Sequence, residues 1–232
     1  NNIINMEDII INNNNIYIIM KKYYMNLAEA IDKDLLNIKN KRNIILKLTK
    51  ALAFLKSNGI IHRDIKPENI LLDKDFNPIL CDFSLAKLFS GVHSEGTHTG
   101  KIATVTYRPP EVVLKKEYSF PVDSWSLGVV CFEMFFKQFL GFTTDKETLD
   151  FFQNNLESIG NSTVSKTLKG LLNPNPKKRW TPDKVLHNYY KIEYKPDIIF
   201  NICQNCVISN TIKNICDCFE VEKKITRWAA QI

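Results

Sequence analysis

The chain has 232 residues, of which 44% are hydrophobic and 24% charged, and its formal net charge is +6 at pH 7. This length suits one large domain with a tail, and the composition is that of an ordinary globular protein that can bury a core. The basic residues are scattered, and no apolar run reaches the ~18–20 residues needed to cross a bilayer. We therefore expect neither nucleic acid nor a membrane as a partner.

The N-terminal quarter predicts a β-hairpin followed by a helix. Two β-branched runs, NIINMEDIII and NIYIIM, are separated by Asn12 to Asn15, which is a turn signal. From about Lys41 to Asn58 apolar residues recur at helical spacing, and Gly59 follows as a cap. The first residues do not have the form of a secretory signal, so we expect reduced cysteines and a cytoplasmic or nuclear location.

The middle of the chain predicts short buried strands, a long loop and a buried helix. The stretches GIIHRD, NILLD and NPILCDFS indicate strands or their edges, and residues 84–110 indicate a long loop of the kind that is usually functional. Residues 123–136, DSWSLGVVCFEMFF, are apolar almost all round, which predicts a buried central helix. Shorter amphipathic helices follow at 149–159, 163–172 and 182–190, the last opened by Thr181 as N-cap and Pro182.

Five motifs follow one another along the chain at fixed spacing. HRDIKPEN is followed, 13 residues after its Asn, by DFS, then by YRPPE, by DSWSLG and by the Arg of NPNPKKRW. This series resembles the C-terminal lobe of protein kinases over roughly residues 1–190. The resemblance implies an α+β, protein kinase-like fold, mostly helical, with remnant β-strands of the N-terminal lobe. It places a hinge near residues 20–26, a C-terminal lobe over 27–190 and a Cys-containing tail over 191–232.

The resemblance assigns catalytic roles to the polar residues of these motifs. Asp64 would accept or orient the proton of the attacking hydroxyl, and Lys66 would bring its ammonium to the migrating phosphoryl group. A Lys at this place is similar to the Ser/Thr-kinase form of the loop. Asn69 and Asp82 would coordinate Mg²⁺ through hard oxygen atoms, so ATP and Mg²⁺ are the expected cofactors. Thr104 would bridge Asp64 and Lys66. For Asp64 or Asp82 taken alone, the alternative is a solvated turn residue.

An adenine pocket is implied upstream of these motifs. NIYIIMKKYYMNL resembles the fifth strand and hinge of a kinase. Met20 would be the gatekeeper beside the adenine, the backbone of Lys21 and Tyr23 would bind its edge, and Leu71 would form the floor. Plain core packing is the alternative for Met20 and Leu71, and it is compatible because such pockets are apolar.

Three residues are implied to support the site. The carboxylate of Asp123 would accept the backbone N–H groups of residues 62 and 63, a charge-assisted bond that fixes the catalytic loop; a simple N-cap is its alternative. Glu111 would form a buried ion pair with Arg179 and tie the end of the long loop to the last helices.

The long loop narrows the resemblance to one branch of the family. Arg108 in YRPPE is similar to the cyclin-dependent and mitogen-activated kinases, which prefer Ser or Thr followed by Pro. Thr99 lies where that branch carries its activating phosphothreonine, with Thr97 as a second candidate, and Arg63 would pair with the phosphate. The alternative is an unmodified, exposed Thr99. Protein substrates and a cyclin-like activator are the implied partners.

The chain departs from the family pattern at several positions. Ser84 stands where the family has Gly, and we expect strain there because Ser reaches the backbone angles of Gly only at a cost. Pro109 replaces the usual Ala and Thr106 replaces a Trp, which puts the preference for Pro in doubt. The insert that the branch usually carries after Ile159 is missing.

The front of the kinase pattern is also missing, because no Gly-x-Gly-x-x-Gly sequence and no Lys-bearing strand precede the hinge. The chain is then either a piece of a longer, active kinase with its N-terminal lobe truncated, or a catalytically silent kinase-like scaffold. The complete lower catalytic set favours an ATP-dependent protein serine/threonine kinase, cyclin-dependent-kinase-like and Pro-directed. For the 232-residue chain alone we expect weak or absent activity.

The tail holds a cluster of four cysteines, Cys203, Cys206, Cys216 and Cys218. Four thiolates at this spacing would suit Zn²⁺, although the second pair is one residue tighter than the usual knuckle. Free thiols on a packing or poorly ordered tail are the alternative. Phe219, Ile225 and Trp228 stand among charged residues beyond the cysteines and indicate a docking helix.

Overall fold

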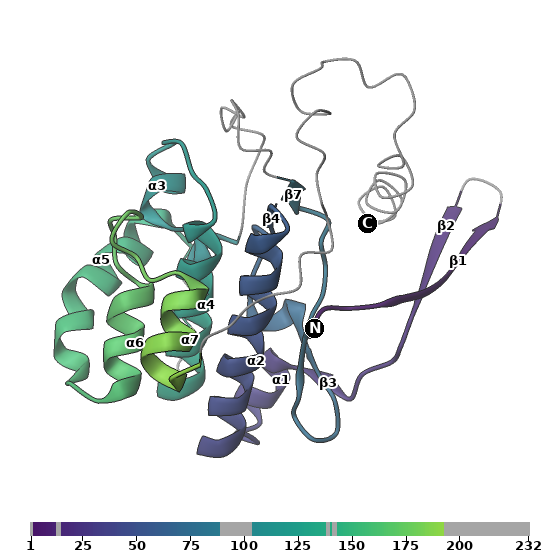
Figure 1. Ribbon diagram of the computed structural model, residues 1–232, viewed down its shortest axis with the longest axis horizontal. Helices are drawn as coiled ribbons and strands as arrows, with labels where there is room; N and C mark the ends of the chain where they lie inside the picture. The colour runs from purple at the N-terminus through teal and green to yellow at the C-terminus, as the bar shows by residue number, and fades with distance from the viewer. Residues whose placement is uncertain (1, 13–14, 89–103, 138–139, 141–142, 193–232) are drawn as a thin grey trace.

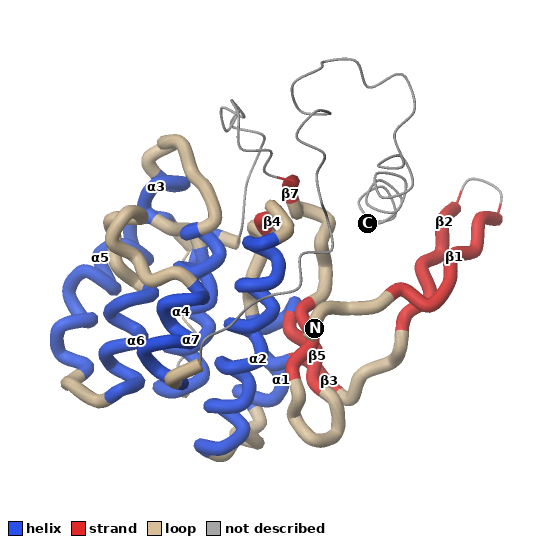
Figure 2. The backbone as a smooth tube through the Cα atoms, in the orientation of Figure 1, coloured by secondary structure: helices blue, strands red, loops and turns tan. Residues whose placement is uncertain are grey.

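The computed structural model describes residues 2–12, 15–88, 104–137, 140 and 143–192. Its helices gather on one side of the molecule and its short strands on the other (Figure 1, Figure 2). The expected α+β class, mostly helical with few short strands, is confirmed. No described helix is both long enough and apolar enough to traverse a bilayer.

The predicted N-terminal hairpin is present. Strands β1 (Met6–Asn12) and β2 (Asn15–Met20) pair antiparallel, with Asp8 opposite Ile19 and Asn12 opposite Asn15. The hairpin extends away from the helices, and apolar side chains on it are exposed (Figure 1).

The other strands form two small sheets close to the helices. β3 (Met25–Asn26), β5 (Ile70–Leu72) and β6 (Pro78–Leu80) form an antiparallel sheet in that order. β4 (Ile60–Ile61) pairs with β7 (Lys87–Leu88). The expectation of a continuous loop over residues 84–110 is wrong at β7, because two residues are too short to leave a periodic signal but gain partners from β4.

The described residues contain seven helices. They are α1 (Leu27–Asp32), α2 (Ile38–Ser57), α3 (Pro110–Val113), α4 (Pro121–Phe136), α5 (Asp145–Asn155), α6 (Thr163–Leu171) and α7 (Pro182–Tyr190), with 3₁₀ turns at Pro67–Asn69, Val105–Tyr107 and Leu156–Ile159. All but α1 and α3 lie where the sequence predicted a helix. The six residues of α1 were not predicted because they span less than two helical turns. Thr181 caps α7 as predicted, and its side chain accepts the N–H of Lys184.

Two helices begin earlier than predicted because capping boxes precede their apolar residues. In α2, Asn37 and Asn40 each accept the backbone N–H of the other residue. In α5, Thr144 and Glu147 do the same. Polar caps satisfy the free N–H groups of the first turn, so they extend a helix beyond its apolar stripe.

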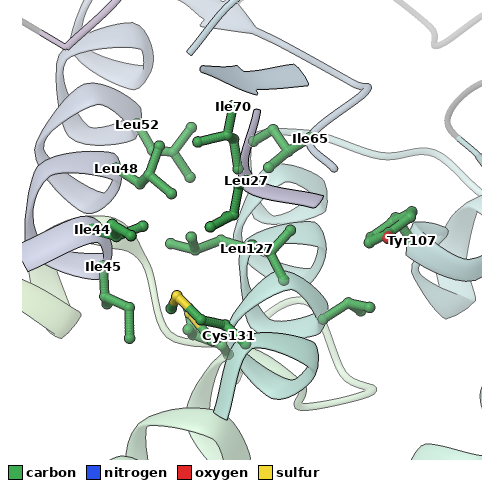
Figure 3. Packing of buried hydrophobic residues seen from close by; sticks show 14 of the residues in the cluster. Leu27, Ile44, Ile45, Leu48, Leu52, Ile65, Ile70, Tyr107, Leu127 and Cys131 are labelled. Atoms are coloured by element: carbon green, nitrogen blue, oxygen red, sulfur yellow. The ribbon is translucent and has the colours of Figure 1, made fainter. Parts of the chain in front are cut away.

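Helix α4 is the centre of the core, as its all-round apolarity predicted. Residues 122–134 of this helix are all buried. Leu127 and Cys131 on α4 lie close to Ile44 and Leu48, which reach across from α2 (Figure 3). Ile70 of β5 joins the same cluster. A helix surrounded in this way is a rigid frame for the polar residues that it carries.

Gly170 in α6 is required by the close approach of Trp180. Its carbonyl accepts the N–H of Trp180 at 2.8 Å, and a Cβ atom at Gly170 would lie 2.3 Å from Cδ2 of the indole ring. We expect Gly170→Ala to lower the free energy of unfolding by about 1–3 kcal/mol, because the ring must move to admit the methyl group. Urea denaturation followed by circular dichroism measures the loss.

The double variant Gly170→Ala/Trp180→Leu tests the cause of that loss. Since Leu removes the indole ring, adding the methyl group in the Trp180→Leu background should cost much less than in the wild type. An equal cost in both backgrounds would contradict the contact as the cause.

Candidate active site

The segment that follows β4 is held by Asp123 in the first turn of α4. The N–H of His62 donates to Oδ2 of Asp123 at 2.8 Å, and the N–H of Arg63 donates to Oδ1 at 2.9 Å. Arg63 has a left-handed φ of 71°, which is unfavourable for a residue with a side chain. The two bonds to one buried carboxylate therefore fix a strained turn immediately before Asp64.

His62 links this turn to the strand that leads to Asp82. Burial lowers the pKa of His62 to about 4, so its ring is neutral at physiological pH. Its Nε2 lies 3.0 Å from the carbonyl oxygen of Cys81, and its Nδ1 accepts the N–H of Asp64 at 3.3 Å. The ring therefore carries its proton on Nε2 and holds two chain segments together.

Three of the predicted residues converge on the carboxylate of Asp64. Its Oδ2 lies 2.9 Å from Nζ of Lys66 and accepts Nδ2 of Asn69 at 2.9 Å. Its Oδ1 accepts both the N–H and the hydroxyl of Thr104 at 3.3 Å. Thr104 in turn accepts Nζ of Lys66 at 3.1 Å, so it bridges the two residues. Because every neighbour donates, the carboxylate is held in one orientation.

Asn69 and Asp82 lie beside one another through the pairing of their strands. Ile70 of β5 is opposite Leu80 of β6, and the N–H of Cys81 donates to the carbonyl of Asn69 at 3.0 Å. The amide nitrogen of Asn69 donates to Asp64, which leaves its amide oxygen for another partner. One exposed carboxylate and one amide oxygen are hard ligands that suit Mg²⁺ with phosphate oxygens as further ligands.

The turn after Asp82 corrects one expectation. Asp82 itself has a left-handed φ of 59°, whereas Ser84 does not have a positive φ. The expected strain at Ser84 is therefore wrong. Asp tolerates this conformation better than most residues, and its Oδ1 accepts the N–H of Ser84 at 3.2 Å.

The residues expected to bind adenine lie where the β1–β2 hairpin leads into the sheet of β3, β5 and β6. The N–H of Tyr24 donates to the carbonyl of Leu72 at 2.9 Å. The segment after Met20 therefore runs towards β5, the strand that contains Leu71. Nζ of Lys21 lies 5.9 Å from the centre of the Tyr23 ring. Met20 is half-exposed, so core packing does not account for it within the described residues.

Arg63 extends towards the end of the described part of the long loop. Its Nε donates to the carbonyl of Leu85, and its Nη1 donates to the hydroxyl of Tyr118 at 3.1 Å. Pairing of β7 with β4 places Lys87 opposite Ile61, so a second cation lies near Arg63. Sequence reasoning missed Lys87 because its position depends on that pairing. Thr97 and Thr99 lie outside the described residues.

The Glu111–Arg179 pair is buried and bidentate. Nη1 and Nη2 of Arg179 lie 2.6 and 2.9 Å from the two carboxylate oxygens of Glu111, and both residues are less than 5% exposed. Arg179 also donates to the carbonyls of Asn173 and Pro121, and its guanidinium lies 5.1 Å from the centre of the Trp125 ring. These bonds attach α3 to the start of α4 and to the segment before α7.

A second buried carboxylate of α4 holds the segment around Tyr107. Glu133 accepts the hydroxyl of Tyr107 at 2.8 Å and the N–H of Leu140 at 3.0 Å. Burial raises the pKa of Glu133 to about 7. Sequence reasoning missed this residue because one Glu in an apolar helix carries no motif. Asp123 and Glu133 thus anchor two segments of the site to one helix.

Stability is expected to fall as pH rises through the range in which Glu133 ionises. The pKa of Glu133 is about 7 in the folded chain, above the 4.5 that is ordinary for Glu, so the folded state retains the proton to higher pH than the unfolded state. Between about pH 5 and 8 we expect Glu133→Gln to flatten the pH dependence by up to about 3 kcal/mol. Urea titrations at several pH values measure this effect, and Glu117→Gln, at an exposed position between α3 and α4, is the matched control variant. Parallel curves for wild type and Glu133→Gln would contradict the shift.

The remaining predicted site residues are the cysteines of the tail, which lie outside the described residues. Within the described ranges, no group of three or more His, Cys, Asp or Glu residues is arranged to hold a metal ion. Cys81 and Cys131 are free thiols there, and burial raises the pKa of Cys81 to about 11, so it is a poor nucleophile.

Comparisons with known proteins match this arrangement. A family model described as "Protein kinase domain" matches residues 1–191. The "Cyclin-dependent kinase 4 homolog" of Caenorhabditis elegans is 34% identical over 129 residues, which cover 55% of this chain and 31% of that protein. The chain therefore spans about a third of the length of this curated relative. The solved structure "Crystal Structure of the yeast RNA Pol II CTD kinase CTDK-1 complex" has a TM-score of 0.71 at 22% identity, covering 85% of this chain and 78% of that one, and supports the fold alone.

Proposed function

The chain belongs to the protein kinase family, and we propose that it is a cyclin-dependent-kinase-like enzyme that transfers the terminal phosphate of ATP to Ser or Thr of protein substrates. The observation that carries the proposal is the convergence of Lys66, Asn69 and Thr104 on the carboxylate of Asp64. A solvated turn residue has no need of three positioned partners, whereas a group that accepts a proton at one fixed point does.

Each residue of the cluster has a distinct task in the proposed reaction. Asp64 accepts a hydrogen bond from the substrate hydroxyl and aligns its oxygen for attack. Lys66, whose side chain is partly exposed, neutralises charge on the phosphoryl group as it moves. Thr104 keeps Asp64 and Lys66 at a fixed separation, so the loop that it belongs to must be in place before the site is complete.

Asn69 and Asp82 would hold Mg²⁺ on the phosphates of ATP. The metal ion supplies charge neutralisation between the β- and γ-phosphates when it is bound. Asn69 is oriented for this by its bonds to Asp64, and Asp82 by the bond from Ser84. The backbone at Lys21 and Tyr23 and the side chains of Met20 and Leu71 would receive the adenine.

The regulation of the site is proposed from the same residues. A phosphate on Thr99 would meet the guanidinium of Arg63, with Lys87 as a second cation on the adjacent strand. Such a pairing would order the long loop and hold Thr104 against Asp64. We further propose a preference for Ser or Thr followed by Pro, and a cyclin-like activating partner.

Phosphotransfer and nucleotide binding test this function together. The 232-residue chain and the longest protein encoded by the same reading frame would be assayed with ATP, Mg²⁺ and a peptide pair that differs only in Pro or Ala after the Ser. For the longest protein we expect Mg²⁺-dependent ATP binding and a turnover that is greater for the Pro peptide. For the 232-residue chain alone we expect weak or absent turnover. A protein that binds no ATP–Mg²⁺ in either form would instead be a silent scaffold.

A further inference from the structure

An apolar patch lies at the end of α2 that is farthest from the active site. Leu35, just before α2, is 41% exposed, and Ile38, the first residue of α2, is 55% exposed. Phe136, the last residue of α4, is 46% exposed. We call these three residues the basal patch. It lies at the lower end of α2 in Figure 1, whereas β4 and the catalytic loop follow the upper end.

The basal patch is joined across the two helices by polar and aromatic contacts. Nζ of Lys137 lies 2.7 Å from Oδ2 of Asp34, which ties the residue after Phe136 to the residue before Leu35. Nζ of Lys41 lies 5.7 Å from the centre of the Phe135 ring. The Phe136 ring stacks on that of Phe132 at 4.5 Å. These contacts hold the start of α2 and the end of α4, which carry the patch residues, next to each other.

The described chain ends beside this patch. Helix α7 runs antiparallel to α2, because Asp183 at its start pairs with Lys56 and the hydroxyl of Tyr190 at its end donates to the carbonyl of Arg42 at 2.8 Å. Arg42 is one helical turn from Ile38. The described chain therefore ends, at residue 192, close to the end of α2 that carries the basal patch.

The last residues of the chain have the pattern of an amphipathic helix. In FEVEKKITRWAAQI, residues 219–232, the apolar residues Val221, Ile225, Trp228 and Ile232 recur at intervals of four, three and four. This spacing places them on one face, with Glu, Lys and Arg on the others.

We propose that residues 219–232 bind the basal patch of the same molecule as a helix, with Trp228 and Ile225 on Ile38 and Phe136. About 30 residues separate the end of α7 from this segment, and a tether of that length gives an effective concentration in the millimolar range. A contact that would be weak between two separate molecules is then formed for much of the time within one molecule. This tethering favours the tail over a second copy or another protein as the occupant.

The binding mode has a consequence for the active site. The occupied patch lies at the opposite end of α2 from Asp64, so the tail anchors to the domain without covering the catalytic residues. This inference does not depend on phosphotransfer, and its failure would leave the proposed function unchanged.

Hydrogen exchange measured by mass spectrometry on the full 232-residue chain tests the proposal. We expect the amides of residues 221–232 to exchange about tenfold or more slowly than those of residues 207–214. Ile38→Glu and Trp228→Glu should each abolish the difference while leaving the exchange of α4 unchanged. The matched control is Leu114→Glu, because Leu114 is also exposed (58%) but lies beyond α3.

The result that overturns the proposal is equal exchange in the two tail segments of the wild-type chain. Protection that survives Ile38→Glu and Phe136→Glu would also overturn it, because the tail would then bind elsewhere. Protection that is lost on dilution, together with a doubled mass in sedimentation, would assign the patch to a second copy. The variants change both sides of the proposed contact, the basal patch and the tail. If a patch variant misfolds, Trp228→Glu therefore remains as an independent test.

Discussion

Asp64→Asn is expected to lower turnover by about 10²- to 10⁴-fold and to change the affinity for ATP–Mg²⁺ little. The carboxylate accepts hydrogen bonds from Lys66, Asn69 and Thr104, and all of these neighbours are donors. An amide at Asp64 would turn one N–H group towards a donor and could no longer accept a proton. Steady-state phosphotransfer and equilibrium nucleotide binding, measured on the longest protein of the reading frame, separate the two effects.

The control for this variant is Asp75→Asn. Asp75 lies on the exposed turn between β5 and β6, so the same change of charge there should leave turnover within about twofold. A companion variant, Asp82→Asn, should weaken Mg²⁺-dependent ATP binding, which Asp64→Asn should not. Undiminished turnover of Asp64→Asn would contradict the assignment of Asp64 as the group that orients the substrate hydroxyl.

Glu111→Ala is expected to lower the free energy of unfolding by about 3–5 kcal/mol, because it leaves the guanidinium of Arg179 buried without its counter-charge. Arg179 is 3% exposed and its remaining partners are two backbone carbonyls and the Trp125 ring. Arg179→Ala should cost a similar amount. Urea denaturation followed by circular dichroism and by fluorescence measures both.

The double variant Glu111→Ala/Arg179→Ala distinguishes a lost pair from two independent losses. It should cost clearly less than the sum of the single variants, since neither charge is left buried alone. Lys33→Ala is the matched control, because it breaks an exposed pair with Glu29 at 3.7 Å and should cost under about 1 kcal/mol. Strict additivity of the two buried variants would contradict the pair as the source of the effect.

Helix α4 explains how a site made of loops is held in place. Asp123 at its start fixes the turn before Asp64, and Glu133 near its end fixes the segment around Tyr107. Arg179 attaches α3 to the start of the same helix. Because α4 is buried on all sides, these three anchors cannot move independently of the core.

The sequence by itself determined the family, the order of the elements and the candidate catalytic residues. Asp64, Lys66 and Asn69 stand within a few residues of one another, so their types and spacing are visible without a fold. The buried helix, predicted over 123–136 and found over 121–136, was equally visible, since apolarity on all faces has few other causes. Caps such as Thr181 were predicted because they act on neighbouring N–H groups.

Only the tertiary structure decided which distant residues meet. Lys87 lies near Arg63 because β7 pairs with β4. Glu133 holds the segment around Tyr107 because the packing of α4 brings its carboxylate to the Tyr107 hydroxyl. The strain lies at Asp82 rather than Ser84 because the conformation of that turn depends on the paired strands before it. The position of residue 192 near the basal patch likewise follows from the antiparallel packing of α7 on α2. Helix periodicity and caps depend on residues that are neighbours in sequence, so they can be recognised without a fold. The contacts named here join residues far apart in sequence, and tertiary packing decides which of them meet.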